Sequence, residues 1–505
     1  MRPDPALDLR LVPSALAAWS VTAAGIVWPI GPGVAVAFLA CGAVGLLAAR
    51  SPGGGLLRAG GAGVIGVAVV GAGFGFAVGL RSDAVRDHPV AHRFGSTSWV
   101  TVTPGESPRP LSNGRLMFRA ALDRLGDDDS SGQVLVFASA AGIGDLIAGQ
   151  PVRFRARVGR PTRRDLTVAV LTAVGEPARG RAGVLQRAAQ AVRAGFAAAA
   201  RGVLPPDQAA ILPGLVLGDT SAVAPATAAQ FRTVGLTHLT AVSGANVTIV
   251  CGAVLLCARV IGPRPAVTLA AGALVLFVVV VQPSASVLRA AVMGAIALLA
   301  VLSGRRRQAI PVLSASVIAL MIAAPQLAVD VGFALSVSAT AALVVLAPAW
   351  SARLTARGVP KPLADGICIA LAAQLVTAPL VAAISGRLSL VGVLANLAVA
   401  VVIPPITLLG TAAAALCPVW PSAAGLLIRF TGPELWWLLR VADTGAALPA
   451  AAVPVPSGWA GLVLVGGATV MAVALWRRRW FRSAGAGGLL GLVAWYLSAA
   501  LAGQQ

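Results

Sequence analysis

Residues 11–30 read LVPSALAAWSVTAAGIVWPI and hold no charged side chain. A helix of this length crosses a hydrocarbon core of about 30 Å. Two more apolar runs follow at once, from about Val34 to Ala49 and from Gly60 to Leu80. A cleavable signal peptide is the alternative interpretation of the first run. We set it aside because further apolar runs follow directly and the chain stays apolar to its end.

The composition is typical of a chain that lies mostly in lipid. Of its 505 residues, 57% are hydrophobic and 11% are charged, with a formal net charge of +21. A soluble protein of this size needs far more polar surface. We therefore predict a polytopic α-helical membrane protein with about 11 to 13 transmembrane helices. The later candidate spans begin near Ala241, Ala266, Ser284, Gln308, Val329, Leu363, Leu388, Pro405, Gly458 and Ala484.

The orientation follows from the short basic loops, since cytoplasmic loops of membrane proteins concentrate Lys and Arg. If all of these basic loops lie in the cytoplasm, the chain is a multi-pass protein of the cell membrane, with residues 81–234 outside the cytoplasm. This threading needs one extra crossing after residue 385, where Pro404 and Pro405 interrupt an apolar run. The basic loops lie at residues 50–58, 259–264, 305–307, 353–361 and 477–482.

Residues 81–204 form the one long polar stretch, and its first part has a β pattern. Turn-forming clusters separate five short β-prone runs. These runs are Ser98 to Thr103, Arg115 to Leu122, Gln133 to Ala138, Pro151 to Val158 and Leu166 to Val174. Five strands of this length suit a small OB-like β-barrel, and a two-sheet sandwich is the alternative. We therefore predict an inserted extracytoplasmic barrel domain over residues 81–180.

The fourth run, PVRFRARV, alternates apolar and basic residues with period two. Its apolar side chains face the core, and Arg153, Arg155 and Arg157 share the solvent face. The C-terminal part of the polar stretch carries eleven arginines against two acids. Such a face suits single-stranded DNA, and anionic lipid headgroups are the alternative partner. The run lacks the interleaved aromatics of a base-stacking platform, since Phe154 points inward.

Residues 181–234 follow the barrel as amphipathic and juxtamembrane helices. Ala182 to Arg201 has helical spacing, with Arg187, Arg193 and Arg201 among alanines. A helix of this kind suits the membrane surface.

Metal and nucleotide chemistry find no support in the sequence. The five cysteines lie in apolar runs without metal-ligand or disulfide spacing. His88 and His92 are spaced i, i+4, but Pro89 separates them and no third ligand is near. The nucleotide-binding pattern GxxxxGK[ST] is absent. We therefore expect no cofactor and no enzymatic activity, and any motor must be a separate ATPase, the proton gradient or trapping of the substrate.

Polar residues concentrate where the chain re-enters its apolar region. Residues 214–219 read GLVLGD, and residues 230–247 read QFRTVGLTHLTAVSGANV. Polar groups at membrane depth are costly, so a functional role is the default interpretation. These segments resemble the ComEC family, the inner-membrane DNA channel of natural competence, with its L-G-D and F-R-x-x-G-L-x-H-L-x-A-x-S-G patterns.

The resemblance continues in the same order downstream and covers roughly residues 1–430. Residues 283–293, PSASVLRAAVM, are similar to the family's P-S-x-x-R-A-x-x-M segment, and residues 330–336, DVGFALS, to its D-V-G-F-Q-L-S segment. It implies a three-helix region over residues 1–80 before the barrel and a competence-type helical domain over residues 235–505.

Three features depart from the family pattern. Asn246 stands where family members commonly carry histidine, and PTRRD at residues 161–165 replaces an N-P-G-x-F-D-type segment. Many members also carry a C-terminal metallo-β-lactamase-like domain. This chain has only three histidines and no such site, so we expect nuclease chemistry from a partner.

The resemblance implies channel or motif roles for Asp219, Arg232, His238, Ser243, Gly244, Asn246, Arg289, Asp330, Gln374 and Asn396. Structural alternatives stay open. Asp219 is placed to cap a helix, and Arg289 is placed to pair with Asp330 on another span. Gln374 and Asn396 suit hydrogen bonds between helices, and Ser243 with Gly244 suits close helix packing.

The sequence thus predicts a membrane channel that passes single-stranded transforming DNA into the cytoplasm. Its expected partners are the DNA, the lipid bilayer, and a separate nuclease, DNA receptor and cytoplasmic ATPase. One alternative is a transporter of a small-molecule or lipid-linked substrate. Another is a membrane hydrolase built on Asp219, His238 and Ser243. In that hydrolase the base would lie about 140° around a helix from the serine, which disfavours it.

Overall fold

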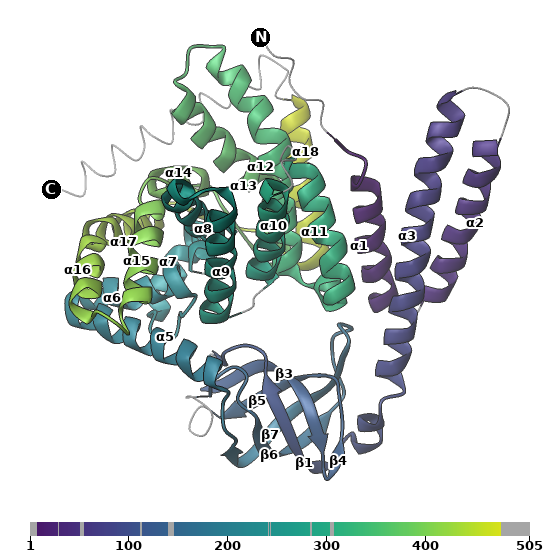
Figure 1. Cartoon of the computed structure of the whole chain (residues 1–505), viewed down its shortest axis with the longest axis horizontal. Helices are drawn as coiled ribbons and strands as arrows, with labels where there is room; N and C mark the ends of the chain where they lie inside the picture. Colours follow the sequence, from purple (N-terminus) through teal and green to yellow (C-terminus); the bar gives the residue numbers. More distant parts are fainter. Residues whose placement is uncertain are drawn as a thin grey trace. The chain divides into compact units, whose positions relative to one another are not determined.

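The computed structural model of the protein describes residues 8–28, 30–50, 55–111, 114–139, 146–240, 242, 244–282, 285–302 and 308–475 (Figure 1). The chain divides into two compact units. The first comprises Met1–Val223, Leu239–Ser336 and Pro404–Gly432, and the second comprises Ala224–His238, Val337–Ile403 and Pro433–Gln505.

Long apolar helices dominate the part of the chain that the structure describes. Six are long and apolar enough to cross a membrane: Gly61–Arg93, Gly244–Ile261, Pro263–Val281, Val331–Thr355, Lys361–Ser385 and Gly458–Leu475. The broken pair Gly392–Val399 and Ile403–Leu416 is a seventh candidate. Four shorter apolar helices are Val12–Val27, Gly31–Leu47, Ser286–Ala300 and Ala309–Ala323. The predicted multi-pass helical architecture is therefore confirmed.

The break predicted near Pro404 and Pro405 is present, and both prolines lie in the first turn of α15 (Ile403–Leu416), where the missing N–H costs no helical hydrogen bond. The basic loops at residues 305–307 and 477–482, and the span predicted from Ala484, lie outside the described residues.

The first unit begins with three helices, α1 (Val12–Val27), α2 (Gly31–Arg50) and α3 (Gly55–Arg86). Helices α2 and α3 run side by side (Figure 1). Their backbones approach closely at Gly75, where an added Cβ would lie 3.0 Å from the backbone nitrogen of Ala35. Small residues allow such close contacts. In lipid the hydrophobic effect does not drive helices together, so van der Waals packing of this kind stabilises the helix pair instead.

The polar stretch of the first unit folds into a closed β-barrel of five main strands. They are β1 (Thr97–Pro104), β3 (Arg115–Leu125), β5 (Gln133–Ser139), β6 (Val152–Gly159) and β7 (Thr167–Arg179). The order is β1-β6-β7-β5-β3, and β3 pairs again with β1 to close the barrel. All of these pairs are antiparallel except β5–β7, which is parallel.

The five predicted strands are therefore confirmed, and the closed ring excludes the sandwich alternative. Two short strands, β2 (Arg109–Pro110) and β4 (Asp128–Asp129), pair with β3 at the rim.

Alternating apolar residues fill the barrel. Along β6, each residue from Val152 to Val158 is buried or exposed in strict alternation. Phe118, Phe154 and Leu171 are fully buried in the shared core. Each contributes about 1.5–3 kcal/mol by leaving water. A one-residue slip of β6 would turn its arginines inward, so this pattern fixes the register.

The remaining helices of the first unit carry the L-G-D turn and several other motif residues. Helix α6 ends at Gly218, whose φ of +73° closes the helix in the left-handed conformation and delivers Asp219. These helices are α5 (Val184–Val203), α6 (Pro206–Leu217), α8 (Gly244–Ala258), α9 (Pro263–Val281), α10 (Ala285–Leu302), α11 (Ala309–Ala323), α15 and α16 (Pro421–Phe430), with the short helices η1 (Pro89–Arg93), η3 (Arg259–Ile261) and η4 (Pro325–Val329). Helix α12 (Val331–Thr355) starts in this unit and continues into the second.

The second unit is helical with one small hairpin. Helix α13 ends at Gly386 with a φ of +62°, which turns the chain into β8 (Arg387–Ser389). That strand pairs antiparallel with β9 (Ala452–Pro454). The other elements are α7 (Pro225–Thr233), η2 (Thr237–Leu239), α13 (Lys361–Ser385), α14 (Gly392–Val399), α17 (Gly432–Ala447) and α18 (Gly458–Leu475).

Candidate nucleic-acid interface

One face of the barrel combines arginines with an aromatic ring. Arg153, Arg155 and Arg157 are all exposed on β6, as predicted. Trp99 on the neighbouring strand β1 lies opposite Arg155 in the register and is 46% exposed. The guanidinium of Arg153 lies 5.5 Å from the Trp99 ring centroid. The run itself lacks an outward aromatic, as the inward-facing Phe154 predicted, and the ring on this face comes from the adjacent strand.

The charges on this face remain available to a ligand. Arg153 lies 3.9 Å from the carboxylate of Asp127, but both side chains are at least half exposed. Such a pair contributes about 0–1 kcal/mol and is screened by salt. An indole beside several guanidinium groups can stack a base while the cations meet the phosphates on either side.

Helix α10 carries an arginine that is buried among the motif segments. Arg289 is 6% exposed. Its Nε donates a hydrogen bond of 2.8 Å to Oγ of Ser336 on α12, and its Nη1 lies 3.0 Å from the sulfur of Met293. A Cβ added at Gly244, where α8 begins, would lie 3.0 Å from its Nη2. Three segments that are distant in the sequence therefore meet at this guanidinium.

Arg289 does not form the ion pair with Asp330 that the sequence left open. The carboxylate of Asp330 instead accepts a hydrogen bond of 2.8 Å from the backbone N–H of Phe333 and lies 3.7 Å from Nη1 of Arg119 on β3. Within the described residues, no carboxylate pairs with Arg289. A buried cation in this situation gains from any anion that reaches it.

A second buried arginine, Arg193, supports the L-G-D turn by hydrogen bonds. Arg193 on α5 donates to the carbonyl oxygens of Leu217, Val280 and Val281, at 3.0, 3.2 and 3.3 Å. It thus caps the C-terminal ends of α6 and α9 together. Burial lowers the pKa of Arg193, and the nearby Asp219 carboxylate opposes that shift. Of the three arginines expected on this helix, Arg187 and Arg201 are exposed and Arg193 is buried.

Asp219 and Asn246 complete this arrangement. Oδ1 of Asp219 accepts hydrogen bonds from the backbone N–H and the hydroxyl of Ser221, at 3.1 and 2.6 Å. This is a local turn, and the next helix begins only at Pro225. Nδ2 of the buried Asn246 donates to the carbonyl oxygen of Leu215 at 2.9 Å. Asn246 therefore connects α8 to α6.

In the second unit, the remaining motif residues gather around the turn from β8 to α14. Gly235 has a φ of +74°, and an added Cβ would lie 3.4 Å from Ser389. Nε2 of Gln374 lies 3.4 Å from the carbonyl oxygen of Ser389. Nδ2 of Asn396 donates a hydrogen bond of 2.7 Å to the carbonyl oxygen of Gly392. Gln374 and Asn396 thus support this turn by hydrogen bonds.

His238 and Arg232 belong to the same motif. Arg232 on α7 is exposed. The side chain of His238 remains accessible although many protein atoms surround it. The surrounding protein atoms desolvate the imidazole and thereby lower its pKa. A hydrogen bond with the Gly235 backbone opposes this shift with a smaller effect. Ser243 lies outside the described residues, so the hydrolase arrangement is not tested.

Of the two other histidines, His88 forms hydrogen bonds near the barrel, and His92 is exposed. Nε2 of His88 lies 2.6 Å from the carbonyl oxygen of Ser131, and its Nδ1 accepts from the Val90 N–H at 3.2 Å. Among the residues that the structure covers, no group of three or more His, Cys, Asp or Glu side chains is arranged to hold a metal ion.

The comparison with known families covers most of these motif residues. A family model described as "Competence protein" matches residues 215–480, more than half of the chain. The chain belongs to the competence protein family. No curated protein and no solved structure matches it.

Membership of the competence family supports a role in competence DNA uptake. All ten predicted motif residues, from Asp219 to Asn396, lie within the matched range. The barrel precedes it. The resemblance inferred from the motifs is therefore confirmed for the helical region.

Sequence reasoning missed Trp99 on the barrel face and the burial of Arg193. Trp99 alternates with the inward-facing Val100 and Val102 and was recognisable as an outward aromatic. Its position beside Arg153 depends on strand register, which the sequence does not specify. Arg193 falls on the same helical stripe as the buried Ala189 and Phe196. That i−4, i+3 spacing was the available signal for its burial.

Proposed function

We propose that this competence protein is a membrane channel that conducts a single strand of DNA into the cytoplasm. The observation that carries the proposal is Arg289, a buried guanidinium where three motif segments meet and with which no carboxylate pairs in the described part of the chain. Leaving such a charge uncompensated is costly. A phosphate of a passing strand compensates it transiently, which favours entry without creating a tight trap.

In this proposal the barrel receives the strand before the helices do. Its Trp99 and Arg153 platform lies outside the cell membrane and binds the strand by stacking and charge. Residues 81–180 form this receiving domain, and residues 1–80, 181–234 and 235–505 supply the N-terminal helices, the linking helices and the conducting helices. A separate nuclease, DNA receptor and cytoplasmic ATPase supply the degradation, capture and energy.

The test measures DNA in the cytoplasm of a competent host. Labelled DNA that becomes resistant to external nuclease is counted in a deletion strain that carries wild type, Arg289→Gln or Arg201→Gln at equal expression. Arg201 is exposed on α5 and serves as the matched loss of one charge. We expect Arg289→Gln to lower protected DNA at least about tenfold, equivalent to ~1.4 kcal/mol on the barrier.

Surface-bound DNA should remain unchanged in Arg289→Gln, because the barrel is intact. Normal protected DNA in the deletion strain would refute the channel and favour transport of another substrate. Normal uptake with Arg289→Gln would remove Arg289 from the conducting path.

A further inference from the structure

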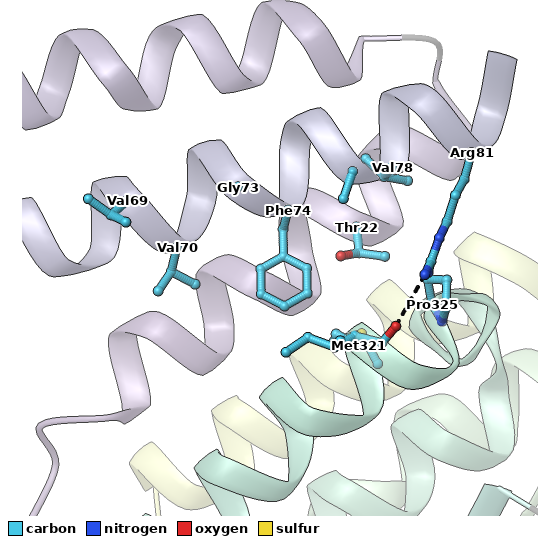
Figure 2. A pocket seen from close by; sticks show the side chains of 11 residues that line it. Thr22, Val69, Val70, Gly73, Phe74, Val78, Arg81, Met321 and Pro325 are labelled. Atoms are coloured by element: carbon cyan, nitrogen blue, oxygen red, sulfur yellow. Dashed lines mark hydrogen bonds between the residues drawn. The ribbon is translucent and has the colours of Figure 1, made fainter.

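A groove lies between α1, α3 and α11 of the first unit (Figure 2). Its volume is about 240 Å³. Val69, Val70 and Phe74 line one end along α3, and Met321 with Pro325 forms the opposite wall. Figure 2 shows Arg81 at the far end of the groove from Val69.

The walls of the groove are apolar. Of the lining residues, Val78 and Met321 are buried, whereas Val69 and Ile322 are 63% and 61% exposed. The one hydroxyl in the lining, that of Thr22, donates to the carbonyl oxygen of Ala18 at 2.6 Å. Between Val69 and Arg81, the side chains of the lining therefore present no polar group that needs water. The exposed residues Val69 and Ile322 lie on helices of a membrane protein, where the surrounding medium is lipid. Hydrocarbon is the filling that matches this chemistry.

Arg81 gives one end of the groove a positive charge. A guanidinium nitrogen, Nη2, donates to the carbonyl oxygen of Ile322 at 3.3 Å, a long hydrogen bond. Four further N–H groups of an arginine remain for an anion. Among the described residues no carboxylate pairs with Arg81. A second cation, Arg164, contacts the carbonyl oxygen of Val27 at the C-terminal end of α1, which packs near Arg81 through Ser82 and Gly25.

The length of the groove matches one leaflet of a bilayer. Val69 and Arg81 are twelve residues apart on α3, which corresponds to about 18 Å. Half of a hydrocarbon core is about 15 Å. A chain that starts with its headgroup at Arg81 thus ends near Val69, close to the middle of the membrane.

We propose that this groove binds one acyl chain of an anionic phospholipid, with the lipid phosphate on Arg81. The lipid fills the space between α1, α3 and α11 and fastens the three N-terminal helices to the rest of the first unit. The site is separate from Arg289 and from the barrel face. A negative result for lipid binding would therefore leave the channel proposal unaffected, and a negative result for the channel would leave this proposal unaffected.

Two variants test the two halves of the site. Arg81→Gln removes the charge, and its control is Arg86→Gln on the same helix, an exposed residue that pairs with Asp83. Gly73→Leu fills the groove, since a Cβ at Gly73 meets no atom within 4 Å. Its control is Gly66→Leu, an equally open glycine of α3 outside the groove.

The measurement is native mass spectrometry of the full chain released from nanodiscs of phosphatidylglycerol or of phosphatidylcholine with the same acyl chains. We expect wild type and both controls to retain one phosphatidylglycerol and little phosphatidylcholine. Arg81→Gln and Gly73→Leu should each lose most of the retained lipid, and inorganic phosphate should not displace it. Equal retention of the two lipids by wild type overturns the proposal, as does wild-type retention by either groove variant.

Discussion

Arg119 on β3 lies 3.7 Å from the carboxylate of Asp330 at the start of α12, which links the barrel to a helix of the competence-type domain. The same guanidinium lies 3.9 Å from Asp165 in the loop before β7. A second link joins the backbone N–H and hydroxyl of Ser107 to Oε1 of Gln282 after α9, at 3.2 and 2.8 Å. The barrel therefore contacts the helices at two places, the start of α12 and the residue after α9.

The double role of Asp330 predicts different effects for two substitutions. Asp330→Asn keeps an acceptor for the Phe333 N–H and loses only the charge, whereas Asp330→Ala removes both. We expect Asp330→Ala to lower the free energy of unfolding by about 1–2 kcal/mol, the usual cost of a lost helix cap. Asp330→Asn should cost about 0–1 kcal/mol, the value of an ion pair near the surface, since the Arg119 side chain is 46% exposed. Thermal unfolding of the purified protein measures both, and equal losses would contradict the capping role.

Gly244 is predicted to be required because Arg289 packs against it. In Gly244→Ala the new methyl would lie 3.0 Å from Nη2 of Arg289 and 3.3 Å from Cβ of Ala290. We expect nuclease-protected DNA uptake to fall at least about tenfold. The control is Gly252→Ala on the same helix, where a Cβ meets nothing within 4 Å. That change should preserve uptake and raise stability by about 0.5–1 kcal/mol. Equal behaviour of the two variants would refute the packing argument.

Arg193 is predicted to position the L-G-D turn through its three carbonyl acceptors. Arg193→Ala leaves buried carbonyl oxygens unsatisfied, at about 1–3 kcal/mol for each group that finds no other partner. Arg193→Lys keeps a donor and should recover part of the loss. Arg201→Ala, an exposed change on the same helix, should be neutral. Thermal unfolding compares the three, and an unchanged Arg193→Ala would exclude this role.

The parts of the fold that depend on local pattern were predictable, and the contacts between segments were not. The alternation in PVRFRARV placed Arg153, Arg155 and Arg157 outside because side chains alternate along any strand. Trp99 reached Arg153 only through the pairing of β1 with β6. Likewise, Gly244 and Arg289 are 45 positions apart, and one sequence contains no information on which helices touch.

His238 is predicted to be neutral at pH 7. Desolvation lowers its folded-state pKa below the unfolded value of about 6.5, so the unfolded chain takes up the proton first on acidification. The stability that neutral His238 contributes is therefore present above about pH 6.5 and is lost below it. Between pH 7.5 and 5 the melting temperature of wild type should fall more than that of His238→Gln. Parallel pH profiles would show that His238 does not titrate in this range.

The barrel face is predicted to bind single-stranded DNA with a strong salt dependence. Replacing Arg153, Arg155 and Arg157 by glutamine in the full chain removes three cations that contact phosphates in the proposed complex. The slope of log affinity against log salt should then decrease by about 2, since each phosphate contact on a single strand contributes about 0.7.

Trp99→Ala tests the stacking half of the same platform. It should cost about 1–3 kcal/mol of binding and leave the salt slope unchanged, because a stacked base releases no counterion. Arg86→Gln on α3 controls for a general loss of charge. Fluorescence anisotropy of labelled oligonucleotides at several salt concentrations gives both quantities. If the triple variant kept the wild-type slope, the DNA would bind elsewhere, and lipid headgroups would become the better partner for this face, because they meet the same arginines without needing Trp99.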